Sequence, residues 1–148
     1  MMNRMLQGKA PIIYGDGEQK RCFSYIDDCL SCLLPMLDRK DLNKQIVNIG
    51  PDEEFVTINK IAELCSNITG INLPPIYKPG RPREVKHATC SADKARKLLD
   101  YKTTVSLKDG MKKTFEYISN RGSKAFDYNI EIEINNELTP KTWTQKEI

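Results

Sequence analysis

The chain has 148 residues, of which 39% are hydrophobic and 29% charged, and its formal net charge is +3. A chain of about 150 residues buries roughly 70% of its unfolded surface, which is enough for one domain with a sizeable core. This composition is typical of a globular protein and excludes a disordered one. The small positive excess, spread among acidic residues, is too small to argue for a nucleic-acid partner, and we expect none; it does suit small anionic ligands.

No apolar stretch reaches the roughly 20 residues that a helix needs to cross a bilayer. The longest, 29–37, is short and contains Pro35. The first residues lack the apolar core of a secretory signal, so we expect a cytoplasmic protein without a membrane partner. The five cysteines are an odd number, which disfavours a complete disulfide framework.

Short elements open the chain. Residues 1–7 have a helical composition and stop at Gly8, and we interpret them as the end of a helix whose beginning is missing. The apolar run 10–14 predicts a strand that leads into a tight glycine loop at 15–17. A brief extended stretch is expected at 23–26.

The next segment predicts a helix and a strand. Asp27 and Asp28 are expected to cap a helix that runs to about Leu37, and Pro35 should kink or shorten it because proline lacks a backbone donor. Residues 45–49 are a second strand candidate.

Three further helices are expected. Thr57 is predicted to cap an amphipathic helix that ends at Gly70, and a second helix begins at about Ser91 after a proline-rich loop, with or without a strand, at 74–85. The last opens at Ser106, in a capping box with the residue three positions on.

The composition shifts after Gly122. Alternation at Tyr128, Ile130, Ile132 and Ile134 predicts one strand, and a polar tail follows. We therefore divide the chain into a lobe at 1–122 and a carboxy-terminal extension at 123–148. Helices that alternate with few strands indicate an α/β or α+β fold with an incomplete sheet.

Four motifs follow one another along the chain. They are Tyr-Gly-Asp-Gly-Glu-Gln-Lys-Arg-Cys-Phe-Ser-Tyr-Ile-Asp-Asp at 14–28, Val-Asn-Ile-Gly at 47–50, Lys-Pro-Gly-Arg-Pro-Arg-Glu-Val at 78–85 and Lys-Ala-Arg-Lys-Leu-Leu at 94–99. In this order and spacing they resemble the carboxy-terminal half of extended short-chain dehydrogenase/reductase enzymes, the nucleotide-sugar epimerases, decarboxylases and dehydratases. The resemblance implies the small substrate-binding lobe of such an enzyme, without a complete Rossmann sheet.

The resemblance also implies binding residues. Arg21 and Arg81 match arginines that contact the nucleotide-sugar pyrophosphate, and a guanidinium fork suits phosphate oxygens at any physiological pH. Glu84 matches an acid that accepts hydrogen bonds from ribose hydroxyls. The strand edge that reads the base corresponds to Ile12, Ile13 and Tyr14. One departure is Arg83, where the family has glycine.

Two family motifs are missing from these 148 residues. The chain has no Gly-x-x-Gly-x-x-Gly turn for NAD, and none of its tyrosines is followed four positions later by lysine. We therefore expect NAD in the complete family enzyme and not on this chain alone, and we assign no catalytic residue. The implied partners are a UDP-sugar and a missing amino-terminal NAD-binding domain.

Several alternatives stay open. The leading function is the substrate-binding portion of a UDP-glucose 4-epimerase-like enzyme. The alternatives are the corresponding portion of a nucleotide-sugar decarboxylase of UDP-glucuronate type, or a non-catalytic truncated module.

Exposed apolar faces would favour homo-oligomers. Glu84 could serve only as a local ion-pair partner. Cys29 and Cys32 are interpreted as core thiols and not as metal ligands.

Overall fold

The computed structural model describes residues 1–125, 127 and 131–146. The elements, in chain order, are α1 (Met2–Met5), β1 (Ile12–Tyr14), β2 (Lys20–Arg21), α2 (Ile26–Met36), the 3-10 turn η1 (Lys40–Leu42), β3 (Val56–Thr57), α3 (Ile58–Thr69), β4 (Ile76–Lys78), α4 (Asp93–Leu99), α5 (Leu107–Arg121) and α6 (Lys141–Thr144). The expected class is confirmed: the fold mixes helices with short strands, and the described residues form no complete Rossmann sheet.

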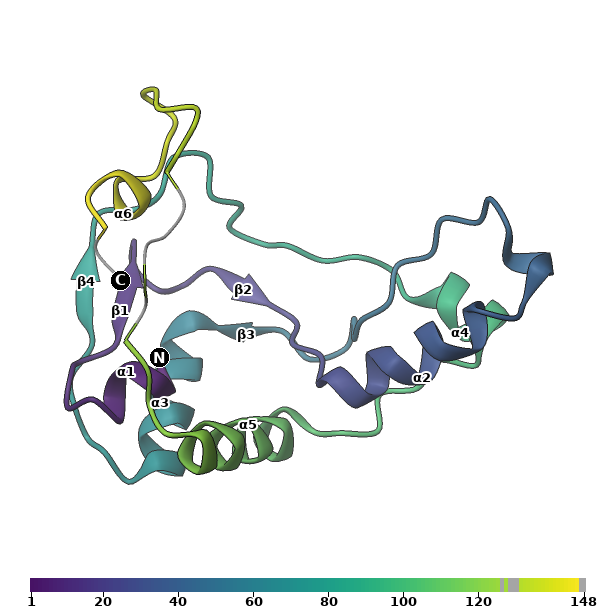
Figure 1. The fold of residues 1–148 in the computed structure, drawn as a ribbon, viewed down its shortest axis with the longest axis horizontal. Coiled ribbons are helices and arrows are strands. Elements are labelled where there is room, and N and C mark those ends of the chain that lie inside the picture. Colours follow the sequence, from purple (N-terminus) through teal and green to yellow (C-terminus); the bar gives the residue numbers. More distant parts are fainter. Residues whose placement is uncertain (126, 128–130, 147–148) are drawn as a thin grey trace.

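The strands form two small sheets. β1 pairs in parallel with β4, with Ile12 opposite Ile76 and Tyr14 opposite Lys78. β2 pairs antiparallel with β3, and Lys20 also bridges to His87. Because β1 and β4 are parallel, the loops that follow them leave the sheet at the same end, which places two distant parts of the sequence side by side (Figure 1).

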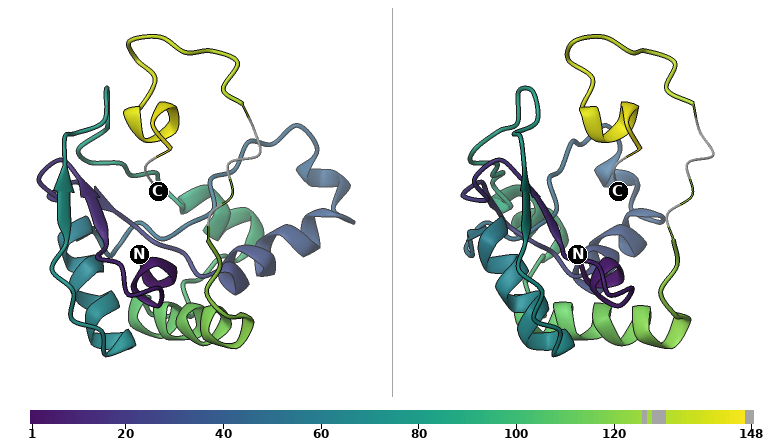
Figure 2. Two further views of the ribbon diagram at one scale, coloured as in Figure 1. Left: turned by 60° about the vertical axis from the view of Figure 1, so that its left-hand side comes forward. Right: turned by 90° about the vertical axis from the view of Figure 1, so that its left-hand side faces the viewer.

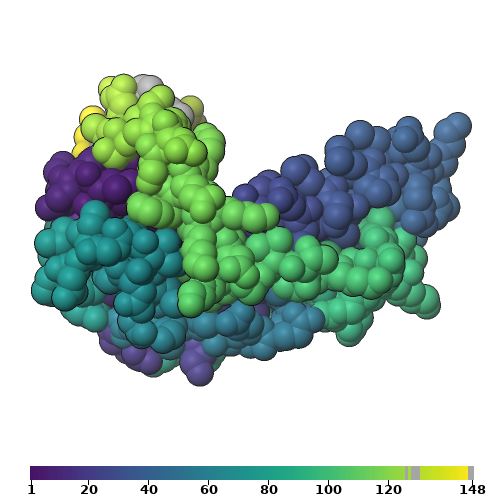
Figure 3. Space-filling model, turned by 90° about the horizontal axis from the view of Figure 1, so that it is seen from below, coloured from purple at the N-terminus to yellow at the C-terminus, as the bar shows by residue number. Residues whose placement is uncertain are grey.

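One core lies where α1, α3 and α5 meet. Its buried residues are Met2, Met5 and Cys65, and the side chains packed against them are Met1, Ile61, Ile68, Ile71, Met111, Phe115 and Ile118. Figure 3 shows α3 in teal beside the green α5. The hydrophobic stripe read from the sequence of the Thr57 helix therefore faces the core, as expected.

The predicted caps Thr57 and Gly70 of α3 and Ser106 of α5 are confirmed, whereas the first helix, expected to stop at Gly8, ends at Met5. Thr57 Oγ1 accepts a hydrogen bond from the Lys60 N–H at 3.1 Å, and Gly70 closes α3 with φ +70°. Ser106 Oγ accepts from the Asp109 N–H at 3.2 Å and donates to the Asp109 carboxylate at 2.6 Å. These contacts satisfy backbone donors that the first turn of a helix leaves free.

A second, smaller core lies in an arm built from α2, α4 and the segment 37–55 (Figures 1 and 2). Its buried residues are Cys32, Ala92, Ala95 and Tyr101, with Val47, Ile49 and Leu99 packed against them. Cys32 is thus a core thiol, as interpreted from the sequence. The other face of α2 and its end carry exposed apolar side chains: Ile26, Leu30, Leu33, Leu34 and Leu37.

Two sequence predictions in the arm are wrong, and the first is the strand at 45–49. Residues 45–49 form no strand, and the Ile46 side chain is 86% exposed. A strand needs a hydrogen-bonded neighbour, and this segment has no strand partner among the described residues. It contributes to the arm instead through its Val47 and Ile49 side chains, which pack against the arm core.

The second wrong prediction is the cap of α2: Asp27 and Asp28 both lie in its first turn, and neither is the N-cap residue. Tyr25 is the N-cap residue and makes no side-chain cap bond. The buried Asp28 carboxylate accepts instead from the backbone N–H groups of Thr104 and Val105, at 3.1 and 3.2 Å, and from the Thr104 hydroxyl. Its role is therefore to join α2 to the segment before α5.

The carboxy-terminal segment also differs from expectation. Ile132 and Ile134 lie in no strand, and the rest of that predicted strand, Tyr128 and Ile130, falls outside the described residues. Part of the expected polar tail is the short helix α6. The segment 123–125 is held to α1 by Asn3, whose side chain exchanges two hydrogen bonds with the Lys124 backbone at 2.8 and 3.0 Å. Within the described residues, no helix is long and apolar enough to span a membrane.

Candidate functional site

A pocket of about 270 Å³ lies at the end of the β1–β4 pair where both following loops emerge. It is lined by Tyr14, Gly15, Asp16, Gln19, Gly80, Arg81, Glu84 and Lys86. These residues come from two segments, 14–19 and 80–86. The pocket is open, and four of its lining residues carry charged side chains: Asp16, Arg81, Glu84 and Lys86.

The parallel strands bring the two segments together. The Gly15 N–H donates to the Lys78 carbonyl at 2.9 Å, which extends the β1–β4 ladder into the loop. Gly15 has φ +76°, and a Cβ there would lie 3.8 Å from the Cα of Gly80. Glycine permits this left-handed backbone, so the loops approach each other at the base of the pocket.

Arg81 is fixed against an aromatic ring. Its guanidinium carbon lies 4.3 Å from the centroid of the Tyr14 ring, within the range of a cation–π contact. This contact leaves the edge of the guanidinium, which carries the N–H donors, available for an anion. The sequence prediction named Tyr14 as a neighbour of the base, and the structure places its ring beneath Arg81.

Arg21 and Glu84 form an ion pair beside the pocket. Arg21 Nη2 lies 3.7 Å from Glu84 Oε1, and the two side chains are 25% and 26% exposed. Arg21 Nη1 also donates to the Lys20 carbonyl at 2.7 Å. A partly exposed ion pair at this separation contributes little to stability, about 0–1 kcal/mol. A ligand anion could therefore compete with Glu84 for Arg21.

The pocket carries both signs of charge. Arg81 and Lys86 are balanced by Asp16 and Glu84 on its lining, and Arg21 adds a cation at the edge. Lys86 Nζ lies 3.9 Å from Asp16 Oδ2, again a long and exposed pair. Loose ion pairs of this kind leave the cations able to reorient toward a phosphate.

The sequence-predicted residues are brought together in part. Tyr14, Arg81 and Glu84 line the pocket, and Arg21 adjoins it through Glu84. Ile12 and Ile13 lie on β1 but outside the pocket lining; the Ile13 side chain is buried, at 1% exposure. Any contact of Ile13 with a base would therefore use its backbone, whereas Ile12 is only partly buried.

The sequence-based site prediction did not name the other lining residues: Gly15, Asp16, Gln19, Gly80 and Lys86. Gln19 is 8% exposed, and its Nε2 donates to the Tyr14 carbonyl at 2.9 Å, which holds the loop between β1 and β2 closed. Asp16, Gln19 and Gly80 belong to the motifs at 14–28 and 78–85, and Lys86 directly follows the second. Their position in or next to these motifs is the sequence signal by which they could have been predicted as lining residues.

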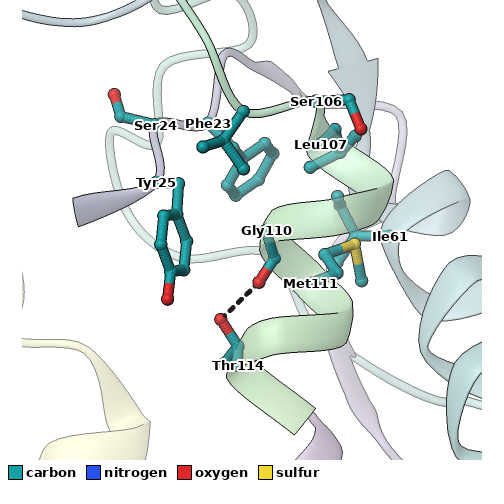
Figure 4. A pocket seen from close by; sticks show the side chains of 10 residues that line it. Phe23, Ser24, Tyr25, Ile61, Ser106, Leu107, Gly110, Met111 and Thr114 are labelled. Atoms are coloured by element: carbon teal, nitrogen blue, oxygen red, sulfur yellow. Dashed lines mark hydrogen bonds between the residues drawn. The ribbon is translucent and has the colours of Figure 1, made fainter. Parts of the chain in front are cut away.

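A second, apolar pocket of about 140 Å³ lies between α5 and the segment 23–25 (Figure 4). Its lining is Phe23, Ser24, Tyr25, Ile61, Val105, Ser106, Leu107, Gly110, Met111 and Thr114. None of the predicted binding residues belongs to it. Among the described residues, no cluster of three His, Cys, Asp or Glu side chains could hold a metal ion.

The residues of the glycine loop do not fit NAD. A dinucleotide turn leads from a strand through glycines to the N-terminus of a helix, which receives the pyrophosphate. Here the loop leads into the strand β2, and Gly17 packs on Asn59 of α3. The NAD-binding arrangement is therefore not built from this loop.

Comparison with known proteins relates the chain to one group of enzymes. The family model for GDP-mannose 4,6 dehydratase matches residues 1–114. The chain is 32% identical over 119 residues to the "Uncharacterized UDP-glucose epimerase YtcB" of Bacillus subtilis, covering 80% of this chain and 37% of that protein. It is 29% identical over 136 residues to UDP-glucuronic acid decarboxylase 1 of Danio rerio, covering 92% of this chain and 30% of the relative.

A solved structure shares the fold. The UDP-glucuronic acid 4-epimerase from Bacillus cereus, in complex with UDP-glucuronic acid and NAD, matches with a TM-score of 0.75 and 34% identity. The match covers 82% of this chain and 38% of the epimerase. The chain thus spans between 30% and 38% of the length of these relatives.

Proposed function

Because this chain belongs to the extended short-chain dehydrogenase/reductase family, among the NAD-dependent nucleotide-sugar epimerases and dehydratases, we propose that it binds the diphosphate of a UDP-sugar. The binding site is the pocket at the end of β1 and β4. The observation that carries the proposal is that Tyr14, Arg81 and Glu84, from segments more than sixty positions apart, line one pocket, with Arg21 paired to Glu84.

The chemistry of the pocket supports a diphosphate. Arg81, held by the Tyr14 ring, offers a fixed fork of donors, and Arg21 can exchange the Glu84 carboxylate for a phosphate oxygen. Displaced from Arg21, Glu84 would be free to accept hydrogen bonds from ribose hydroxyls. Each charge-assisted hydrogen bond contributes about 1.5–3 kcal/mol, so the loss of either arginine should weaken binding substantially.

The proposed activity of the complete enzyme is epimerisation of a UDP-sugar, as in UDP-glucose 4-epimerases. The relatives support both this reaction and a second candidate: the decarboxylase of Danio rerio matches 92% of this chain. The two candidates differ in the sugar, since a decarboxylase requires a uronic acid. Titrating the chain with UDP-glucose and with UDP-glucuronate compares them. Tighter binding of UDP-glucose supports the UDP-glucose 4-epimerase-like candidate and counts against the decarboxylase, whereas tighter binding of UDP-glucuronate fits either a decarboxylase or an epimerase of UDP-glucuronic acid such as that of Bacillus cereus.

We place the NAD site in a unit outside these residues, because the glycine loop does not fit a dinucleotide. The exposed apolar face of α2, with Leu33, Leu34 and Leu37, is the surface that we propose this unit covers. The extended segment 45–49, which has no strand partner among the described residues, would pair with its sheet. We also retain the division into a binding lobe at 1–122 and an extension at 123–148.

Calorimetric titration with UDP tests the proposal. We expect saturable binding by the unmodified chain and a loss of about tenfold or more in affinity for Arg21→Ala and for Arg81→Ala, because each removes a charge-assisted contact. Arg121→Ala is the matched control, since this arginine lies on α5 against Tyr117. Equal affinity of the Arg81→Ala and unmodified chains would refute the assignment of the site.

A further inference from the structure

Asn59, at the start of α3, joins the loop between β1 and β2 to β4. Its backbone N–H donates to the Gly17 carbonyl at 3.0 Å. Its side-chain Nδ2 donates to the Asp16 carbonyl at 3.0 Å and to Glu18 Oε1 at 2.6 Å. Its Oδ1 accepts from the Tyr77 hydroxyl at 3.0 Å. One asparagine therefore satisfies polar groups on three consecutive loop residues.

Gly17 is shaped to receive this side chain. Gly17 is buried, with φ +74°, and a Cβ at this position would lie 2.0 Å from Asn59 Oδ1. No side chain could be added without moving Asn59. The loop and the start of α3 are thus in direct contact, and their positions depend on each other.

The same loop is one wall of the diphosphate pocket. Gly15 and Asp16 line the pocket, whereas Asn59 does not. Asn59 holds the backbone carbonyl of Asp16. The Asp16 carboxylate has two contacts: it accepts from the Glu18 N–H at 2.9 Å, in a turn within the loop, and it forms the long ion pair to Lys86 at 3.9 Å. Neither can fix the loop as firmly as Asn59, because the first is local and the second is exposed.

We propose that Asn59 is a positioning residue, which holds the 15–18 loop in the conformation that completes the pocket and acts on the ligand only through that loop. The inference rests on the proposed function, since the pocket is the site at which UDP is expected. It adds a role for α3, an element that carries none of the residues assigned to the ligand. A pre-ordered loop strengthens binding because the ligand does not have to order it.

Binding of UDP by calorimetry is the first test. Asn59→Ala removes the side chain, and Asn59→Asp keeps its shape but lacks the Nδ2 donors. We expect both to weaken UDP binding on the order of tenfold, as the loss of a few hydrogen bonds implies. Asn67→Ala, at an exposed asparagine of the same helix, should stay within about twofold of the unmodified chain.

Two ligand-free measurements separate positioning from general destabilisation. The amide resonances of Gly15 and Gly17 should move in Asn59→Ala and not in Asn67→Ala, with both variants fully folded. Gly17→Ala should raise the unfolding equilibrium constant in both backgrounds, but on the order of tenfold less in Asn59→Ala than in the unmodified chain, because the clash is gone and only the backbone strain remains.

The outcomes separate the two proposals. If the unmodified chain binds UDP and Asn59→Ala and Asn59→Asp bind it equally well, the positioning role is overturned and the proposed function stands. If the folded chain binds no UDP, the proposed function fails. In that case unchanged glycine resonances and additive Gly17 and Asn59 effects would overturn the role of Asn59 in ordering the loop as well.

Discussion

Single side chains in this molecule join segments that are far apart in the sequence, and Asp28 is the clearest case. Burial disfavours its charged form, but the hydrogen bonds from the Thr104 hydroxyl and from the backbone of Val105 and Thr104 outweigh this and lower its pKa below the usual 3.8. Asp52 is similar: its hydrogen bonds with Arg96 lower its pKa to about 2. Both carboxylates stabilise the fold when ionised.

The lowered pKa of Asp28 means that the stability of the fold decreases as the pH falls. Its contribution is fully present above the unfolded value of about 4 and is lost as the pH falls through the lower folded value. We predict that Asp28→Asn lowers the free energy of unfolding by about 1–3 kcal/mol at pH 6, because an amide cannot replace the charged acceptor.

Urea unfolding at pH 6 and at pH 3 measures this effect. The unmodified chain should lose stability between these values, and Asp28→Asn should lose less. Some dependence will remain in the variant, because Asp52 titrates in the same range. An equal loss of stability between pH 6 and pH 3 in both chains would show that ionisation of Asp28 does not contribute to the pH dependence of stability.

At the scale of elements, contacts between helices and loops determine which residues are tolerated. Gly110 lies in the interior of α5, where alanine would normally stabilise a helix by about 1 kcal/mol. A Cβ at this position would lie 3.2 Å from Tyr25 Cδ2 and 3.3 Å from Tyr25 Cβ. Figure 4 shows the Tyr25 ring beside this turn of the helix.

We predict that Gly110→Ala destabilises the chain by about 1 kcal/mol, because Tyr25 Cβ is close to the backbone and cannot move away freely. Urea unfolding of the unmodified chain, Gly110→Ala, Tyr25→Ala and the double variant gives a double-mutant cycle, which measures the interaction between the two positions. In the Tyr25→Ala background the same substitution should be neutral or stabilising. Stabilisation by Gly110→Ala in the unmodified chain would contradict the packing described.

Local sequence signals predicted the elements with their own caps and the strand at the site. Thr57, Gly70 and Ser106 each specify a helix end through bonds within one turn, so α3 and α5 could be read directly. The segment 45–49 could not, because a strand depends on a neighbour in space. The burial of Asp28 depends on Thr104, 76 positions away, which no local pattern reveals.

The candidate site was predictable to the extent that its residues belong to the recognised motifs. Arg81, Glu84 and Tyr14 were named from those motifs and lie at one pocket. Asn59 was not named, because a polar residue after a helix cap resembles any solvated position. Its role is visible once Asp16, Gly17 and Tyr77 are brought to it in space.

At the scale of the whole molecule, the described residues form a body and an arm (Figures 1 and 3). The pocket lies in the body, and the arm carries the exposed apolar side chains of α2. Leu34 is 60% exposed and Leu37 is 81% exposed, and both lie at the end of α2 or directly after it. Contiguous apolar surface of this kind favours association.

We predict that the isolated chain self-associates at high concentration and that Leu34→Glu reduces this association, because a charge on the face disfavours its burial. Sedimentation velocity over a range of concentrations measures it. Tyr117→Glu is the control, since Tyr117 is 63% exposed but lies on α5 outside the arm. Monomeric behaviour of the unmodified chain at every concentration would count against an interface on this face.

The pocket between the loops after β1 and β4 is the site that we propose for a nucleotide diphosphate. The measurement that tests this proposal most directly is an amide-resolved NMR titration of the chain with UDP. We predict saturable shifts confined to residues 14–21 and 78–86, where the pocket and Arg21 lie. Saturable shifts clustered elsewhere, such as around the apolar pocket of α5, or no shifts in a folded chain, would contradict the account.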